Sequence, residues 1–469
     1  MHGNKQILIA VVMILLTSLA CSIPFSNNGP TPEDISATAA AAISATLTAM
    51  APVEVPTAIP DVETPMDTPI PETTPTTVVK SKPDQLRLAM VDSNQNLSSW
   101  QEDGSLSLIV NTGDVSQAVL SPDGEWIVFT RTSPDGIDIS LWAIRFDGSD
   151  EKILVSHADF LAMPLHPDIT DPSTVLTIAP YMIEFIPGTH TVAFNTYPQF
   201  EGPGFFDNKD LWYVNVETVE RRSFLSPSQA GHFYFSLDGS QMALVTPNQI
   251  DLLNTDGSNR RFAVLIYDFV LTYSEFAYHA KPIWSADSSF LRVAIPPQDP
   301  LGDATAPVKI YHIPTDGSMA TLLTSILVAP LDNAMLAPDT NHFAFKEQLG
   351  DPADNQFSLK FADLSGSTPT EFTTGSLGFG AWAPDSSHFY FINWNPRTAL
   401  IGQVGAPGVI ALDANPAINF SWVTADRYLF IYQSGANYQL RIGTLSTASV
   451  EIASLGSGLG TPSYDFVSP

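Results

Sequence analysis

The chain has 469 residues, with 49 acidic against 20 basic side chains and a formal net charge of −29. This charge argues against a nucleic-acid surface, because phosphate binding needs clustered lysine and arginine. The single cysteine excludes an intramolecular disulfide and any site built from several thiolates. A hydrophobic fraction of 44% is enough for a sizeable core, and the length allows several domains or one large repeat architecture.

Residues 1–21 have the order of a secretory signal peptide: a short start with one base, an apolar run over residues 7–16, then small residues up to Cys21. The apolar part is shorter than the ~20 residues that a membrane-spanning helix needs. The cysteine at the cleavage position resembles a bacterial lipoprotein signal, which implies a lipid on Cys21, although Ser18 stands where such signals usually have leucine. The alternative is an ordinary signal peptide. Mass spectrometry of the membrane fraction distinguishes the two, because an unmodified Cys21 contradicts the lipoprotein.

Residues 22–84 are expected to form a linker rich in proline, threonine and alanine. Between residues 30 and 83 there is no aromatic side chain, so this segment cannot bury enough apolar surface to fold. A short alanine-rich helix after Thr31 and Pro32 is the one ordered element that we expect in it. We therefore expect an exported chain, anchored through its N-terminal lipid to the outer face of the cytoplasmic membrane or within the cell envelope.

The remainder of the chain is a repeat. Ser121-Pro122-Asp123-Gly124 precedes an apolar strand, and similar four-residue phrases precede other strands at residues 236–239, 285–288, 337–340 and 383–386, with weaker copies near 186 and 423. Proline fixes φ, aspartate bonds the local backbone and glycine ends the turn, so each phrase predicts a tight hairpin. Most intervals between copies lie between 40 and 52 residues, which is the period of propeller blades.

A second marker accompanies the first. A leucine or isoleucine stands six residues before an Asp-Gly pair in four of the repeats, at Leu97, Leu141, Ile250 and Ile310. A single Asp-Gly is a weak hairpin signal, but its recurrence at one offset predicts third strands that turn into fourth strands.

Residues 121–156, SPDGEWIVFTR followed by DISLWAIRFDGSDEKILVS, resemble the repeat of TolB-like propellers, a relative of the WD repeat. The resemblance covers residues 85–469 and implies an all-β propeller domain of four-stranded antiparallel blades around a central channel. No counterpart of the separate α/β domain of TolB precedes it, so the role of TolB is not transferred to this chain. Seven anchor hairpins, together with unanchored strands at residues 86–110 and a final strand at 465–467, favour eight blades closed by both chain ends. Seven blades are the alternative.

In this architecture the long connections leave the ring on one face, and we expect them at residues 157–180, 196–209, 296–307, 347–356 and 393–399. Loops on a rigid scaffold usually carry function, so this face is the candidate binding surface. Its candidate contact residues are Tyr197, Phe200, Phe205, Phe206, Trp394, Asp207, Asp351 and Asp354, with further acids at Glu201, Asp299 and Asp303. The alternative is that the aromatic side chains only pin the loops to the ring.

No residues in a catalytic arrangement are recognisable. Trp284, Trp382 and Trp422 recur at one repeat position and are expected in the core. His190, His342 and His388 also share a repeat position, and equivalent sites on different blades cannot converge on one ion at the ~2 Å that zinc requires. We therefore expect no metal site and no cofactor, with calcium the one ion left open.

The sequence favours a monomeric, non-catalytic binding or scaffolding module for a protein or glycan of the envelope or the extracellular space. The alternative is a propeller enzyme, such as a metal-assisted hydrolase, lactonase or cyclase, that uses the central channel. The propellers of serine peptidases precede a hydrolase domain with a G-x-S-x-G motif, and that motif does not occur in this sequence.

Overall fold

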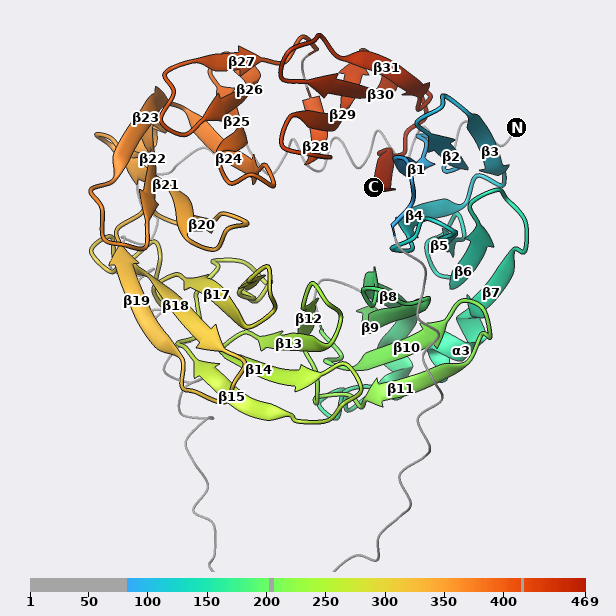
Figure 1. Ribbon diagram of the computed structural model, residues 1–469. Helices are drawn as coiled ribbons and strands as arrows, with labels where there is room; N and C mark the ends of the chain where they lie inside the picture. The colour runs from blue at the N-terminus through green and yellow to red at the C-terminus, as the bar shows by residue number, and fades with distance from the viewer. Residues whose placement is uncertain (1–81, 202–205, 415–416) are drawn as a thin grey trace, which may run out of the picture. The chain divides into compact units, whose positions relative to one another are not determined.

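The computed structural model describes residues 82–201, 206–414 and 417–469, in which 32 strands form eight antiparallel sheets of four strands. The sheets stand in a ring as the blades of a β-propeller (Figure 1). This confirms the predicted fold class and the favoured number of blades.

From the innermost strand outward, the blades have the following bounds. Blade 1 contains β32 (Ser463–Val467), β1 (Arg87–Val91), β2 (Leu97–Gln101) and β3 (Leu106–Val110). Blade 2 contains β4 (Val115–Leu120), β5 (Trp126–Thr132), β6 (Ile139–Arg145) and β7 (Lys152–Val155). Blade 3 contains β8 (Val175–Phe185), β9 (Thr191–Phe200), β10 (Leu211–Asn215) and β11 (Arg221–Leu225). Blade 4 contains β12 (His232–Phe235), β13 (Gln241–Thr246), β14 (Gln249–Asn254) and β15 (Arg261–Ile266).

The other four blades continue in the same order. Blade 5 contains β16 (Ile283–Trp284), β17 (Phe290–Ile295), β18 (Val308–Pro314) and β19 (Thr321–Ile326). Blade 6 contains β20 (Met335–Leu336), β21 (His342–Gln348), β22 (Phe357–Asp363) and β23 (Thr370–Gly375). Blade 7 contains β24 (Leu377–Trp382), β25 (His388–Trp394), β26 (Arg397–Gln403) and β27 (Val409–Ala411). Blade 8 contains β28 (Ala417–Trp422), β29 (Arg427–Ser434), β30 (Asn437–Thr444) and β31 (Val450–Ser454).

Blade 1 is built from both ends of the ring. Its innermost strand β32 pairs antiparallel with β1, and Val467 lies opposite Arg87. The Asp465 carboxylate accepts a hydrogen bond of 2.7 Å from the backbone N–H of Leu120 in blade 2. The last strand therefore both completes its own blade and joins it to the next, and it pairs the inner edge of β1, which would otherwise be open.

The repeated phrases form the predicted hairpins. In the first copy, the Ser121 hydroxyl donates to the Asp123 carboxylate (2.7 Å) and accepts from the Trp126 N–H (2.9 Å). Gly124 has a φ of +67° and donates to the Ser121 carbonyl (2.8 Å). Ser288 and Ser386 occupy the glycine position in two other copies and keep a φ of +58°. The turn geometry is thus retained where the glycine itself is not.

The repeated tryptophans connect neighbouring blades. The indole N–H of Trp284 donates to the backbone carbonyl of Tyr234 (3.1 Å), on the innermost strand of the preceding blade. Trp382 and Trp422 make the same contact to the preceding blades, at 2.9 and 3.4 Å. The expected core role is therefore accompanied by a hydrogen bond between blades, which satisfies the buried indole N–H.

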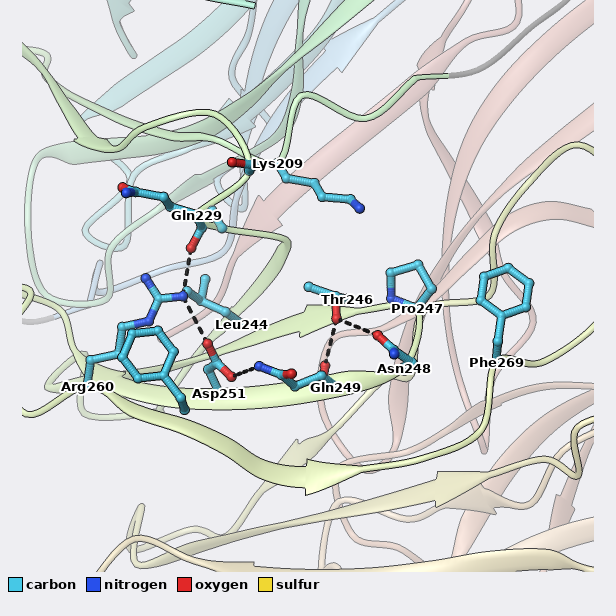
Figure 2. Close-up of a pocket in the computed structure, with 13 residues that line it drawn as sticks. Lys209, Gln229, Leu244, Thr246, Pro247, Asn248, Gln249, Asp251, Arg260 and Phe269 are labelled. Carbon is cyan, nitrogen blue, oxygen red and sulfur yellow. Dashed lines mark hydrogen bonds and ion pairs between the residues drawn. The ribbon is translucent and has the colours of Figure 1, made fainter. Parts of the chain in front are cut away.

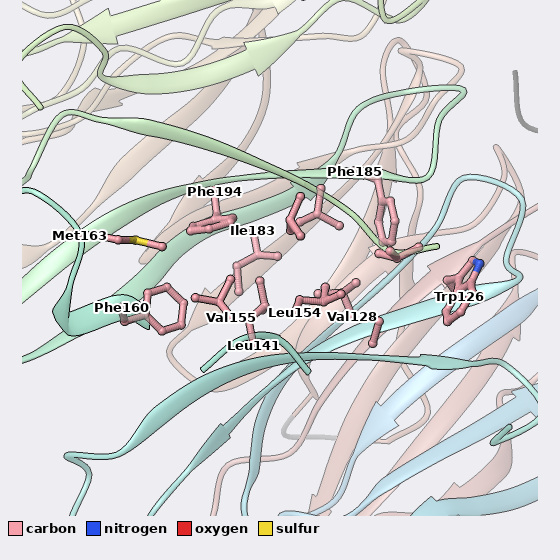
Figure 3. Close-up of a cluster of buried hydrophobic side chains, with 14 of the residues drawn as sticks. Trp126, Val128, Leu141, Leu154, Val155, Phe160, Met163, Ile183, Phe185 and Phe194 are labelled. Atoms are coloured by element: carbon pink, nitrogen blue, oxygen red, sulfur yellow. The ribbon is translucent and has the colours of Figure 1, made fainter. Parts of the chain in front are cut away.

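The hydrophobic core consists of clusters that lie between neighbouring blades. Figure 3 shows the cluster between blades 2 and 3, where Trp126 and Phe194 are fully buried. The short helix α3 (His157–Leu161) adds Phe160 to this cluster, and Ser156 and Asp159 form a capping box at its N-terminus.

Three of the expected long connections are shorter than predicted. Residues 157–180 contain α3, the 3₁₀ helix η1 (Pro172–Thr174) and the first part of β8, and β9 continues to Phe200. Residues 393–399 are a tight turn at Asn395 and Pro396 between two long strands. The connections are shorter because the β8–β9 and β25–β26 ladders extend further from the anchor hairpins than expected. Parts of the expected connections are therefore hydrogen-bonded strand.

The predicted signal peptide, Cys21 and the predicted linker as far as residue 81 lie outside the described residues. Among the residues that the structure describes, no helix is long and apolar enough to cross a membrane.

Candidate functional site

Long connections gather on one face of the ring, over blades 3 to 5. This loop face carries residues 206–210, 267–282 and 296–307, all on the side where the innermost strands begin. The Leu271 N–H donates to the Gln298 carbonyl (2.8 Å), and the Tyr273 hydroxyl donates to the Asp299 carboxylate. The connections of blades 4 and 5 are therefore fixed to one another. The connection at residues 267–282 was not predicted among the long connections.

Apolar side chains are exposed along these connections. They form what we call the apolar ridge: Phe269, Leu271, Tyr273, Leu301 and Leu331, each between 43% and 57% exposed. The Leu331 N–H donates to the Pro300 carbonyl (3.4 Å), which holds the blade 5–6 connection against that of blade 5. Acidic side chains are exposed beside the ridge at Asp268, Glu275 and Asp303. Grouped apolar side chains with a charged rim are typical of a docking surface.

Two histidines and an aspartate meet beside the ridge, at the junction of blades 3, 4 and 5. Asp207 precedes β10, His232 is the first residue of β12, and His279 lies in the connection to β16. Their ligand-type atoms lie within 4.8 Å of one another. The two imidazole rings stack at 3.7 Å with an angle of 10°, and the Tyr181 ring lies 5.4 Å from His232. We call Asp207, His232 and His279 the histidine cluster.

The enclosure of this cluster disfavours charged imidazoles. Desolvation, followed by the charges of His279 and Lys281, lowers the pKa of His232 to about 3. Desolvation also lowers the pKa of His279, against the opposing charge of Asp207. Desolvation and the charge of Asp207 raise the pKa of Tyr197 to about 12. At neutral pH both histidines are therefore uncharged and Tyr197 is protonated.

A buried polar network holds the segment that carries Asp207. The Asp210 carboxylate accepts hydrogen bonds from the backbone N–H and the hydroxyl of Thr196 (2.8 and 2.6 Å), from the Trp212 indole (2.8 Å) and from the Asn208 amide (3.0 Å). Burial nevertheless raises the pKa of Asp210, because desolvation outweighs these donors. The Ala230 N–H donates to the Lys209 carbonyl (2.7 Å), which ties the same segment to the start of blade 4.

Acidic groups also lie on the innermost strands, with Glu184 on β8 and Asp465 on β32. The Glu184 side chain on β8 is accessible to solvent, but the surrounding blades reduce the solvation of its carboxyl group. Desolvation, followed by the charge of Asp465, raises the pKa of Glu184 to about 7. Burial raises the pKa of Asp465 as well. These two carboxyl groups belong to blades 3 and 1, and each keeps its proton to a higher pH than an ordinary carboxyl group does.

A pocket of about 630 Å³ opens at blade 4, next to Lys209 (Figure 2). The Arg260 guanidinium lies between the Asp251 carboxylate (2.9 Å) and the Gln229 carbonyl (2.7 Å). The Gln249 amide also donates to Asp251 (2.6 Å). The Arg260 and Asp251 charges of this pocket are therefore already paired with each other.

A second group of acids and a histidine joins blades 2 and 3. His190 Nε2 lies 3.0 Å from Asp123 and its Nδ1 lies 3.2 Å from Glu217. Both ring nitrogens thus have carboxylate partners within the protein. Burial opposes protonation, but the hydrogen bond and charge of Asp123, together with Glu217, raise the pKa of His190. This arrangement is a contact between blades.

The candidate contact residues predicted from the sequence are divided around the ring. Tyr197 and Phe200 lie on β9, and Phe206 packs edge-on against His166 at 4.9 Å. Asp207 belongs to the histidine cluster, and Phe205 lies outside the described residues. Asp351 caps the 3₁₀ helix η2 (Pro352–Asp354), which ends at Asp354 in blade 6, and Trp394 lies half-exposed in blade 7. Blade 7 stands across the ring from blade 3, so these residues do not form one patch (Figure 1).

His232 and His279 were not predicted. They stand four and six residues before the anchors at Ser236 and Ser285, so they are not equivalent repeat positions. The argument that equivalent histidines cannot converge therefore does not apply to this pair. The available signal was the presence of histidines before two successive anchors.

No family model and no curated protein matches the sequence. Among solved structures, an eukaryotic initiation factor is similar at 10% identity and a TM-score of 0.47, over 81% of this chain and 98% of that one. The β-propeller domain of the Trilobed protease from Pyrococcus furiosus is similar at 10% identity and a TM-score of 0.44, over 74% of this chain and 97% of that one. TolB from Acinetobacter baumannii is similar at 14% identity and a TM-score of 0.31, over 58% of this chain and 68% of that one.

Proposed function

We propose that this protein is an extracytoplasmic, membrane-anchored binding or scaffolding module, and that it docks a protein ligand on its loop face. The observation that carries the proposal is the apolar ridge on the connections of blades 4 and 5. The exposed side chains lie on loops that are hydrogen-bonded to one another above a rigid ring, as between Leu271 and Gln298. A partner that covers them gains roughly 25 cal/mol for each Å² of apolar surface removed from water.

The acidic rim indicates the complementary chemistry of the partner. Asp268, Glu275 and Asp303 are exposed around the ridge, and the whole chain carries a net charge of −29. Complementary charge speeds association and excludes partners of like charge. We therefore propose a partner with an apolar centre and basic residues around it.

The test compares two variants of the full chain with equal loss of exposed apolar surface. Leu271→Ser with Leu301→Ser removes part of the ridge, whereas Leu106→Ser with Leu108→Ser changes outer-strand leucines of blade 1 that are about equally exposed. In quantitative capture from the solubilised envelope of the native host, we expect the ridge variant to retain at least 10-fold less partner than wild type. The blade 1 variant should capture as wild type does. Equal capture by the ridge variant and wild type, or equal loss in both variants, contradicts the proposal.

A further inference from the structure

The histidine cluster presents unused ligand atoms toward a common point. His279 Nδ1 lies 3.2 Å from the Ala277 carbonyl, and a carbonyl can only accept, so Nδ1 carries the proton and Nε2 keeps its lone pair. His279 Nε2 is buried and has no hydrogen-bond partner among the described residues. A hydrogen bond from one ring nitrogen to a backbone carbonyl is the usual way in which a metal-binding histidine is oriented.

Asp207 is oriented in the same manner. Its Oδ1 accepts from the Lys209 N–H (2.9 Å), while its Oδ2 is buried and has no hydrogen-bond partner within residues 82–201, 206–414 and 417–469. The polar network around Asp210 fixes the backbone of this segment, as described above. A buried acceptor without a donor costs free energy. A cation bound between His279 Nε2 and Asp207 Oδ2 would remove this cost for both atoms.

We propose that Asp207, His232 and His279 bind a divalent first-row transition metal ion, with zinc as the reference ion. Two imidazoles and one carboxylate suit zinc and its neighbours better than calcium or magnesium, which prefer sets of oxygen ligands. Three protein ligands leave a fourth tetrahedral position for water or a further ligand.

Binding requires a local adjustment. Ligand distances near 2.0–2.2 Å place the atoms of a tetrahedral site roughly 3.3–3.5 Å apart, whereas here they lie within 4.8 Å and the two rings are stacked. The rings must therefore splay by rotation about χ2, which is a broad and soft torsion in histidine. His279 is carried by the connection of residues 267–282, whereas His232 is held in β12, so His279 is the ligand that moves.

The cluster of Asp123, Glu125 and His190 is the contrasting case. His190 already has Asp123 and Glu217 at its two nitrogens, and Asp123 also accepts from the Ser121 hydroxyl and the Glu125 N–H. Binding of an ion there would have to break these contacts, so this cluster is expected to stay metal-free. The inference does not depend on the proposed docking function, because the ridge variants leave all three ligands in place.

The test titrates the full chain, stripped with a chelator, with zinc by calorimetry and with cobalt by visible absorption. We expect one zinc ion per chain and the visible bands of tetrahedral cobalt. His279→Gln and Asp207→Asn should each weaken zinc binding at least 10-fold and abolish the cobalt bands. His388→Gln, which changes another histidine close to a carboxylate (2.6 Å from Asp385), should bind as wild type does.

Thermal unfolding supplies a second readout that separates lost binding from lost folding. Zinc should raise the Tm of wild type and of His388→Gln but not that of His279→Gln or Asp207→Asn, since only a bound ion stabilises the folded state. The metal-free variants should unfold within a few degrees of metal-free wild type. Absence of stoichiometric binding in wild type, or equal binding in wild type and the ligand variants, overturns the proposal.

Discussion

Blades 3 and 7 contain the same four-stranded unit but are stabilised in different ways. In blade 7 the buried ring of Phe389 lies 4.5 to 5.9 Å from five other aromatic rings, and Gly402 leaves the space that this ring fills. In blade 3 the first two strands are 11 and 10 residues long, and their extension is held by buried Asn195, Thr196 and Asp210.

The difference shows how one repeat serves two purposes. Apolar packing needs no partner beyond the next blade, so blade 7 contributes mainly to stability. A buried polar network is tolerated only if its groups are satisfied, and in return it fixes the direction of the chain that leaves the strands. In blade 3 it fixes residues 207–210, and so it places Asp207 beside the two histidines.

The largest effect is expected from Phe389→Ala in blade 7. The truncation leaves a cavity among aromatic side chains that cannot collapse easily, so we expect a loss of about 3–5 kcal/mol in the free energy of unfolding. Denaturant unfolding of the full chain measures this loss. A loss below about 1 kcal/mol would show that the packing of blade 7 is less important than the comparison implies. Zinc binding by the folded variant should be unchanged, because the histidine cluster lies across the ring.

Asp210→Ala in blade 3 is expected to have a smaller effect on stability and a larger one on the site. It leaves the Thr196 N–H and the Trp212 indole N–H without their acceptor, at a cost of about 1–3 kcal/mol. Because the network fixes Asp207, zinc affinity should also fall. Denaturant unfolding, as for Phe389→Ala, measures the loss of stability, and calorimetric titration with zinc measures the loss of affinity. A variant as stable as wild type and with full zinc affinity would contradict the positioning role of the network.

The smallest effect is a pH-dependent one at His190, between blades 2 and 3. The pKa of His190 is raised in the folded state, so its stabilising contribution is full below the unfolded pKa of ~6.5 and is lost as the pH rises through the folded value. We expect His190→Gln to cost on the order of 1 kcal/mol at pH 6 and less at pH 9. Thermal unfolding of both proteins across this range measures the difference. If the loss of stability caused by His190→Gln is the same at every pH, the contact stabilises the protein through packing and not through charge.

Much of the ring could be predicted because its signals are local. The Ser121–Gly124 phrase and its copies specify hairpins through turn chemistry, so the seven anchors located seven of the eight blades. The offset between Leu97, Leu141, Ile250 or Ile310 and the following Asp-Gly identified third strands, and each of these residues lies on one. The final strand at residue 465 was recognised as the closing strand by the same reasoning.

The loop face could be predicted only in part. The connection at residues 267–282 was missed because its two anchors are a normal distance apart, and only the shortness of β16 leaves these residues outside the strands. Trp394 was expected in a long connection, yet the strands β25 and β26 pair as far as a tight turn. The length of a strand depends on the elements that its end contacts in the folded protein, and the local sequence does not show these contacts.

The sequence by itself determined the repeat and favoured eight blades closed by both chain ends over seven, since turns and strand periodicity are set by neighbouring residues. Only the tertiary structure decided which side chains meet on the loop face. The distance between His232 and His279 depends on the angle between two blades, and the place of Asp207 depends on a buried network in a third. Such distances arise from packing between elements far apart in the chain, so the histidine cluster became visible only in three dimensions.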